Sequence, residues 1–418
     1  MEFCMRIATQ EILEKIKNRE EHENNFVMSP LSINAMLNMI AMGSTGKTLE
    51  ELLNYLGSET ITDLHSKSLA MVALTSTKKV VGDDDQRCSL ESSPDPPKEC
   101  NQSESWDDWG PERVAKEPTF SMVNGIWSDQ RFPLKPCYLE IAKTIFQAHA
   151  KTVDFVQMAE EARNEVNIWV AKATKGLLKD ILQPGSFDSQ TMVVLANALY
   201  FKGDWLDPFD AYYTRDRDFH LLNGKTVRVP LMAKGYTVNF YGSFDDFKLL
   251  KLPYDHVQGN KQLSMYVFLP HKKDGLQDLM IKFDSDPSLL TKQYDLRREE
   301  LEVILIPKFK FSYAFTASNS MIKLGLTLPF CPKGELTEMV DSPHSDKVFI
   351  SRLFHKSLIE VDEEGTEAAS ETISNDNGYA MRKPKPRTSF VADHPFMFMI
   401  KDDTSGVVFF TGALLNPK

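Results

Sequence analysis

Apolar and polar positions along this chain follow spacings that predict both helices and strands. Residues 158–173 have the spacing of an amphipathic helix, and residues 6–20 also have a helical pattern. Residues 191–201 form a nearly continuous apolar run of strand-forming types. Such a run is typical of a strand that is buried on both faces. We therefore predict that it lies at the centre of a sheet.

Two further helix starts are indicated near the beginning of the chain. Pro30 follows Ser29, and a proline at the first helical position has its φ angle preset and loses no needed donor. A helix is expected from there to near Gly43. Another is predicted to begin at Thr48, whose hydroxyl would cap it together with Glu51, as in a capping box.

The rest of the chain mixes strands and helices without a regular alternation. Strands are predicted at 120–127, 227–230, 262–269, 303–312, 349–361, 389–400 and 407–415, and helices at 275–283, 286–295 and 316–324. A regular βαβ rhythm would indicate a parallel sheet, and it is absent here. The predicted class is α+β with large sheets.

Composition narrows the range of partners. The 418 residues include 59 acidic and 48 basic side chains, which gives a net charge of −11. A surface this acidic repels phosphate backbones, so we expect no nucleic-acid partner. Residues 81–115 are acidic and rich in serine and proline, and they cannot bury enough apolar area to offset their ordering entropy. We predict a disordered insertion there, and favour an unconstrained loop over an acidic docking segment.

The sequence also bears on the compartment. The N-terminal stretch lacks the apolar run of a secretory signal, and no stretch reaches the length of about 18 apolar residues that a membrane-spanning helix needs. The five cysteines follow no metal-ligand spacing. We expect a nucleocytoplasmic protein with reduced thiols, for which non-classical extracellular release is an alternative, and no membrane partner.

No catalytic or cofactor motif is complete. The run from Gly43 to Thr48 resembles the end of a phosphate-binding loop, but Ala41 stands where that loop needs a glycine, and a helix precedes it. The histidines form no HExxH pair, and no GxSxG nucleophile motif is present. We therefore predict no catalytic residues, no cofactor, no metal and no enzymatic activity.

Residues 359–379 carry the most informative pattern in the chain. From Thr366 to Ser374 every second residue is small and weakly polar, and the intervening positions include Glu367 and Glu371. In a strand these two sets would point to opposite faces. The segment could therefore enter a sheet with its small side chains toward a core and its glutamates toward water.

Several runs now show a family resemblance. Residues 363–370 (EEGTEAAS) resemble the hinge of the reactive-centre loop of serpins, and the run from Asp393 to Pro417 is similar to the serpin signature. Further similar runs are 25–33 (NFVMSPLSI), 166–176 and 197–205 (NALYFKGDW). The resemblance covers the chain except for 81–115. The corner at 43–48 and the missing signal peptide look most like plant serpins.

This resemblance implies a single domain over residues 1–418 with the serpin fold. That fold has a large central, mostly antiparallel sheet, two further sheets, eight or nine helices and an exposed reactive-centre loop, here at 363–390. It also implies a suicide-substrate inhibitor, which is monomeric and traps a serine or cysteine protease as a covalent complex. In this mechanism the cleaved loop inserts into the main sheet.

Site residues follow from the resemblance, position by position. The hinge would comprise Glu363, Glu364, Gly365, Thr366, Glu367, Ala368, Ala369 and Ser370. Family spacing from Gly365 places the reactive bond at Tyr379–Ala380, and an aromatic residue there suits the apolar pocket of chymotrypsin-like proteases. Arg382 is the alternative, for a trypsin-like target.

Other matches look structural. Ser29, Ser32, Asn197 and His355 match the hydrogen-bonded shutter beneath the sheet, and Trp205 matches the residue packed where the loop first enters. A non-inhibitory serpin-fold protein for binding or storage is the main alternative function. Small inward residues in the hinge favour inhibition, whereas Asp376 would face inward late in the inserted arm.

Overall fold

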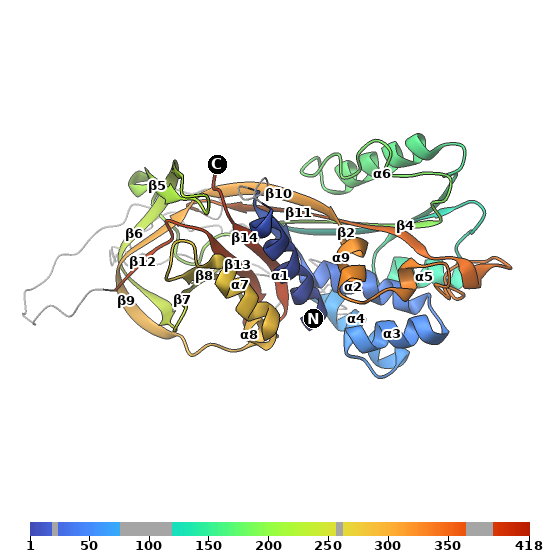
Figure 1. The fold of residues 1–418 in the computed structure, drawn as a ribbon, viewed down its shortest axis with the longest axis horizontal. Helices are drawn as coiled ribbons and strands as arrows, with labels where there is room; N and C mark the ends of the chain where they lie inside the picture. The colour runs from blue at the N-terminus through green and yellow to red at the C-terminus, as the bar shows by residue number, and fades with distance from the viewer. Residues whose placement is uncertain (19–23, 76–118, 256–261, 365–387) are drawn as a thin grey trace, which may run out of the picture.

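The computed structural model describes residues 1–18, 24–75, 119–255, 262–364 and 388–418. Two sheets dominate it (Figure 1). The five-stranded sheet has the order β10 (Phe309–Thr316), β11 (Ile350–Val361), β4 (Val193–Lys202), β2 (Thr119–Asp129) and β3 (His149–Val153). The predicted apolar run becomes β4 in the middle of this sheet, where nine of its ten residues are buried.

The pairing within this sheet is mixed. β10 pairs antiparallel with β11, and β4 pairs antiparallel with β2, but β11 runs parallel to β4, and β2 runs parallel to β3. Parallel neighbours require a long connection between them. The chain supplies such a connection, because β4 and β11 are separated by most of the second sheet.

The second sheet joins what the family resemblance implied as two separate sheets. Its order is β1 (Phe26–Met28), β14 (Val408–Leu414), β13 (Phe396–Asp402), β8 (Leu263–Pro270), β7 (Phe247–Pro253), β6 (Thr226–Ser243), β9 (Arg297–Pro307) and β12 (Thr388–Val391), with β5 (Arg215–His220) paired to β6. The strand β6 is 18 residues long. It pairs with β5 near its start, with β9 along its length and with β7 at its end, so it connects the two parts.

Nine α-helices lie within the described residues, in agreement with the predicted number. They are α1 (Glu2–Lys17), α2 (Pro30–Met42), α3 (Gly46–Leu56), α4 (Ile61–Thr75), α5 (Pro136–Thr144), α6 (Ala159–Ala173), α7 (Leu276–Ser285), α8 (Ser288–Thr291) and α9 (Ala317–Lys323). Figure 1 shows α6 on one face of the five-stranded sheet and α1, α2 and α9 on the other. None of these helices is long and apolar enough to cross a membrane.

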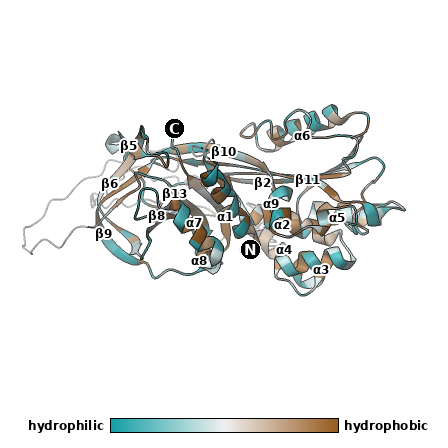
Figure 2. Ribbon diagram, viewed as in Figure 1, coloured by the Kyte–Doolittle hydropathy of each residue, from teal (hydrophilic) through white to brown (hydrophobic). Residues whose placement is uncertain are grey.

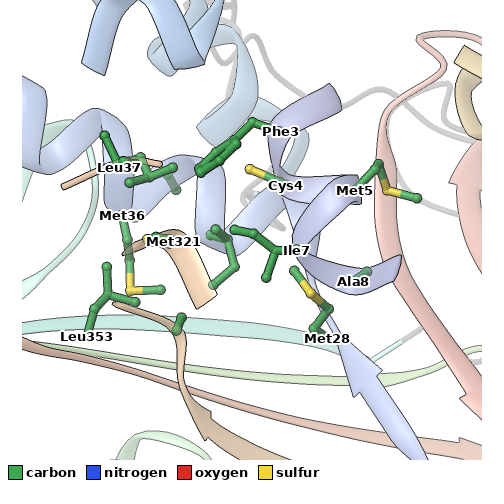
Figure 3. Packing of buried hydrophobic residues seen from close by; sticks show 14 of the residues in the cluster. Phe3, Cys4, Met5, Ile7, Ala8, Met28, Met36, Leu37, Met321 and Leu353 are labelled. Atoms are coloured by element: carbon green, nitrogen blue, oxygen red, sulfur yellow. The ribbon is translucent and has the colours of Figure 1, made fainter. Parts of the chain in front are cut away.

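The core follows from this layering. Helix α2 is buried along nearly its whole length, its polar residues Ser32, Asn34 and Asn38 included, and Figure 2 shows it as a mostly brown and white helix. It packs with α1, α9 and the inner face of β11, where Met36, Met321 and Leu353 meet residues of α1 (Figure 3). A mostly apolar helix without a solvent-exposed side has to be enclosed on every side. The sheet and the surrounding helices provide that enclosure.

The capping box predicted at Thr48 and Glu51 is wrong. Helix α3 begins at Gly46, whose φ of 55° lies in the left-handed region that glycine adopts readily. The Thr48 N–H donates to the carboxylate of Glu335 at 3.0 Å, and within the described residues the Thr48 hydroxyl has no hydrogen-bond partner. A distant carboxylate therefore occupies this helix N-terminus, the feature that resembled a phosphate-binding loop.

Three predicted elements also differ in extent. The predicted strand 303–312 is two strands, since Pro307 cannot donate to the ladder and the chain there passes from β9 in one sheet to β10 in the other. The predicted strand 389–400 is divided into β12 and β13 by a segment that includes Pro395. The predicted helix 286–295 is reduced to the four residues of α8.

Candidate functional site

The candidate site is the seam between β4 and β11, which we define as the junction of these two parallel strands. Their register runs from Ile350 opposite Val193 to Ile359 opposite Phe201. Because the strands are parallel, both end at the same edge of the sheet, which we call the C-terminal end of the seam. The chain continues there from Val361 into the predicted hinge at Glu363 and Glu364.

A buried polar cluster lies at the middle of the seam. The imidazole of His355 on β11 lies 2.9 Å through Nδ1 from the side-chain oxygen of Asn197 on β4. Its Nε2 lies 3.1 Å from the backbone nitrogen of Ser29 and 2.7 Å from the hydroxyl of Ser357. All four residues are completely shielded from solvent. The structure thus brings three of the four predicted shutter residues into direct contact.

The hydrogen-bond partners determine the tautomer of His355. The Asn197 oxygen can only accept, so Nδ1 must carry the proton and donate it. The Ser29 N–H can only donate, so Nε2 must be an acceptor. Burial lowers the pKa of His355 to about 3, because a charged ring would lose its hydration. The ring is neutral at ordinary pH and bonds both strands of the seam.

Ser32, the fourth predicted residue, joins this cluster differently. Its backbone N–H donates to the Ser29 hydroxyl at 3.1 Å, which caps the start of α2. The Ser32 hydroxyl is buried and has no hydrogen-bond partner within the part of the chain that the structure describes. Ser32 therefore acts through the helix cap, and its side chain makes no direct link to the strands.

The C-terminal end of the seam is built around Trp205. The indole is buried and stacks on Tyr254, with ring centroids 4.5 Å apart and planes 13° from parallel. Its Nε1–H donates to the Asp362 carbonyl at 2.9 Å, and the backbone N–H donates to the Glu364 carbonyl at 3.2 Å. The Trp205 segment therefore holds the chain at the point where it leaves β11.

Charged side chains surround the same end. Glu363 on the predicted hinge is buried and pairs with Lys308 at 2.7 Å. Burial raises the pKa of this carboxyl, but the hydrogen bonds it accepts and the positive charge of Lys308 together outweigh burial, so the pKa lies below its usual value. Lys202, the last residue of β4, pairs with Glu360 at 3.1 Å and with Asp362 at 3.2 Å. These last two ion pairs cross the seam.

Most of the predicted loop lies outside the described residues. This holds for the hinge residues from Gly365 to Ser370, for the bond Tyr379–Ala380, and for Asp376 and Arg382. The predicted acidic insertion 81–115 also lies outside them. Within the described residues, no group of histidine, cysteine, aspartate and glutamate side chains is arranged to hold a metal ion.

Sequence reasoning missed several residues of the site. Ser357 lies two positions after His355 on the same strand, so strand alternation places both on one face. Asn124 of β2 lies directly opposite Asn197, from which it accepts a hydrogen bond of 2.7 Å. A buried polar residue in each of two adjacent apolar strands was the available signal. Lys202 and Tyr254 gave no such signal.

Comparison with known proteins agrees with this architecture. The family model for serpins, described as serine protease inhibitors, matches residues 3–417. Among curated proteins, the chain is 39% identical to Serpin-ZXA of Oryza sativa subsp. japonica over 94% of this chain and 90% of that protein. It is also 39% identical to Serpin-Z3 of Arabidopsis thaliana, over 94% of this chain and 92% of that one.

A solved structure supports the same assignment. The Arabidopsis protein AtSerpin1, in a form described as the native stressed conformation, superposes with a TM-score of 0.80 at 34% identity, covering 100% of this chain and 98% of that one. The predicted serpin fold is confirmed, and with it the broad assignment to a family of protease inhibitors. This chain belongs to the serpin family.

Proposed function

We propose that this serpin inhibits its target protease by inserting its cleaved loop into the seam between β4 and β11. The observation that carries the proposal is the parallel pairing of these two strands, with β11 continuing directly into the loop. A segment that turns back after β11 runs antiparallel to it, and therefore antiparallel to β4 as well. Insertion would replace one parallel pairing by two antiparallel ones, which are slightly more stable per residue.

The two faces of the seam suit the two sides of the loop. On the inner face, Leu199, Phe201 and Ile359 belong to a large buried cluster. The small side chains that alternate from Thr366 would meet this face, where larger residues would not fit. The outer face carries Lys202 and Glu360, which are partly exposed. Charged residues such as Glu367 would lie on that side.

The energetics support a trap. About ten new backbone hydrogen bonds at about 1 kcal/mol net each give a gain on the order of 10 kcal/mol. This is comparable with the stability of a whole domain. The uncut form would then be held kinetically, away from its free-energy minimum.

The chemistry requires only the protease's own nucleophile. Its serine hydroxyl or cysteine thiol attacks the carbonyl carbon of Tyr379, the bond to Ala380 breaks, and the new amine of Ala380 leaves with a proton. Tyr379 is then joined to the protease as an ester or thioester. Insertion carries the protease away before water hydrolyses that bond. The aromatic side chain of Tyr379 favours a chymotrypsin-like target.

The proposal is tested by incubating the protein with chymotrypsin and analysing the products on a denaturing gel. We expect a covalent complex that survives SDS and is joined at Tyr379, as mass spectrometry of the peptides would show. Thr366→Arg should convert inhibitor to substrate, because an arginine cannot enter the inner face. Cleavage of the unmodified chain without any complex would contradict the trap, and a complex joined at Arg382 would contradict the chymotrypsin-like specificity.

A further inference from the structure

Three side-chain links join the two strands of the seam, and they differ in kind. Near its start, the hydroxyl of Ser351 accepts the Met192 N–H at 2.9 Å. In the middle, His355 donates to Asn197. At the C-terminal end, Lys202 is paired with both Glu360 and Asp362. This last link joins full charges, whereas the other two join neutral groups.

The charged link stands where a strand would have to enter. Lys202 is the final residue of β4, just beyond the last strand pairing at Phe201 and Ile359. It lies five positions after Asn197 on β4, a distance of about 17 Å at about 3.3 Å per residue. A segment entering from the hinge would therefore separate Lys202 from its partners before it reaches the buried polar cluster.

Within this link, opening of the seam would affect the interactions of Lys202 most, because both of its partners lie across the seam. Glu360 has a second cation, Lys310 at 2.8 Å, on β10, which stays beside β11 when the seam opens. The other oxygen of Asp362, Oδ1, is buried and has no hydrogen-bond partner among the described residues. Separation of the strands by one inserted strand would lengthen both pairs of Lys202 by about 4.8 Å. It would leave Asp362 without its counter-ion.

Burial gives the link more strength than an ordinary surface pair. The side chains of Lys202, Glu360 and Asp362 are only 21%, 18% and 18% exposed. Charge pairs in such surroundings are stronger than fully exposed ones, and their remaining exposure still allows salt to weaken them. The amine also keeps a pKa above its usual value, since its bonds to Glu360 and Asp362 outweigh the effect of burial.

We propose that Lys202 is an electrostatic latch that sets the rate at which the seam admits a strand. This inference rests on the proposed function, because it concerns how loop insertion begins. Lys202 is a positioning residue: it touches neither the protease nor the reactive bond. The latch keeps the uncut chain from inserting its loop early, and it is undone from the same end at which the cleaved loop enters.

The latch is tested on the uncut protein with a fluorescently labelled peptide of residues 366–377, whose uptake is followed by anisotropy. This readout needs no protease. We expect Lys202→Met, which keeps the aliphatic stem, to take up the peptide about tenfold faster than the unmodified protein, and Lys202→Arg to remain within about twofold of it. Lys310→Met is the matched control, because it removes a partner of Glu360 that does not cross the seam, and its rate should change by less than about twofold.

The salt dependence of peptide uptake distinguishes an electrostatic latch from a residue that only stabilises the fold. Raising NaCl from about 0.05 to about 0.5 M should speed uptake severalfold in the unmodified protein and leave Lys202→Met unchanged. Should Lys202→Met not fold, Asp362→Asn weakens the same link and is expected to speed uptake about threefold. Equal uptake rates, or equal salt dependence, in the unmodified protein and Lys202→Met would overturn the latch alone. If no variant admits the peptide, the seam does not open, and the proposed function is overturned with the latch.

Discussion

The middle and the C-terminal end of the seam hold the same two strands together by different means. The middle relies on neutral hydrogen bonds between fully buried groups, centred on His355 and Asn197. The C-terminal end relies on partly exposed ion pairs of Lys202 and on the packing of Trp205. Removing a partner from a buried network leaves unsatisfied groups and lowers the free energy of unfolding strongly. Breaking a partly exposed ion pair lowers it less. The sheet is thus firm in its middle and easier to open where the loop would enter.

The largest expected loss of stability comes from removing a hydrogen-bond partner in the middle of the seam. Asn197→Ala should lower the free energy of unfolding by about 3 kcal/mol, because it leaves the Nδ1–H of His355 and the side-chain oxygen of Asn124 without this partner. Urea unfolding would measure this change, and native gels should show more polymer on warming. Asn239→Ala is the matched control, since Asn239 is also buried, but its side chain bonds to Thr237 of its own strand and, among the described residues, to no neighbouring strand. A similar loss in both variants would remove the special role of the middle.

A smaller loss of folding stability is expected when the pH is lowered. The pKa of His355 is about 3 in the folded protein and about 6.5 in an unfolded chain, so between these values only the unfolded chain takes up a proton. Stability therefore falls as pH falls, by about 2 kcal/mol between pH 7 and pH 5 from this group. Urea midpoints of the protein and of His355→Gln, measured across this range, would show the difference. Identical pH slopes would contradict the neutral buried ring.

Elements that depend on local pattern could be predicted from the sequence, whereas contacts between distant residues could not. The apolar run of β4 and the start of α2 at Pro30 depend on local pattern, and the structure places both where the pattern predicts. The capping box failed because Glu335, 287 residues away in the chain, occupies the position that Thr48 and Glu51 were expected to fill. No local pattern contains that contact.

Within the site, too, some residues could be predicted from the sequence and others could not. The residues of the buried polar cluster could be predicted because the family resemblance marked Asn197 and His355. The ion pairs of Lys202 could not, because lysine at the end of a strand is ordinary, and its partners lie on β11, far along the chain. Opposed charges become visible only when the parallel register of the two strands is known.

The most direct test of strand insertion is thermal melting before and after cleavage of the loop by a protease that cuts within residues 365–387. If the cleaved loop enters the seam, the melting midpoint should rise sharply, because about ten backbone hydrogen bonds are added to the five-stranded sheet. The Thr366→Arg variant, cleaved in the same way, should show little or no rise. An unchanged midpoint in the unmodified cleaved protein would contradict the account.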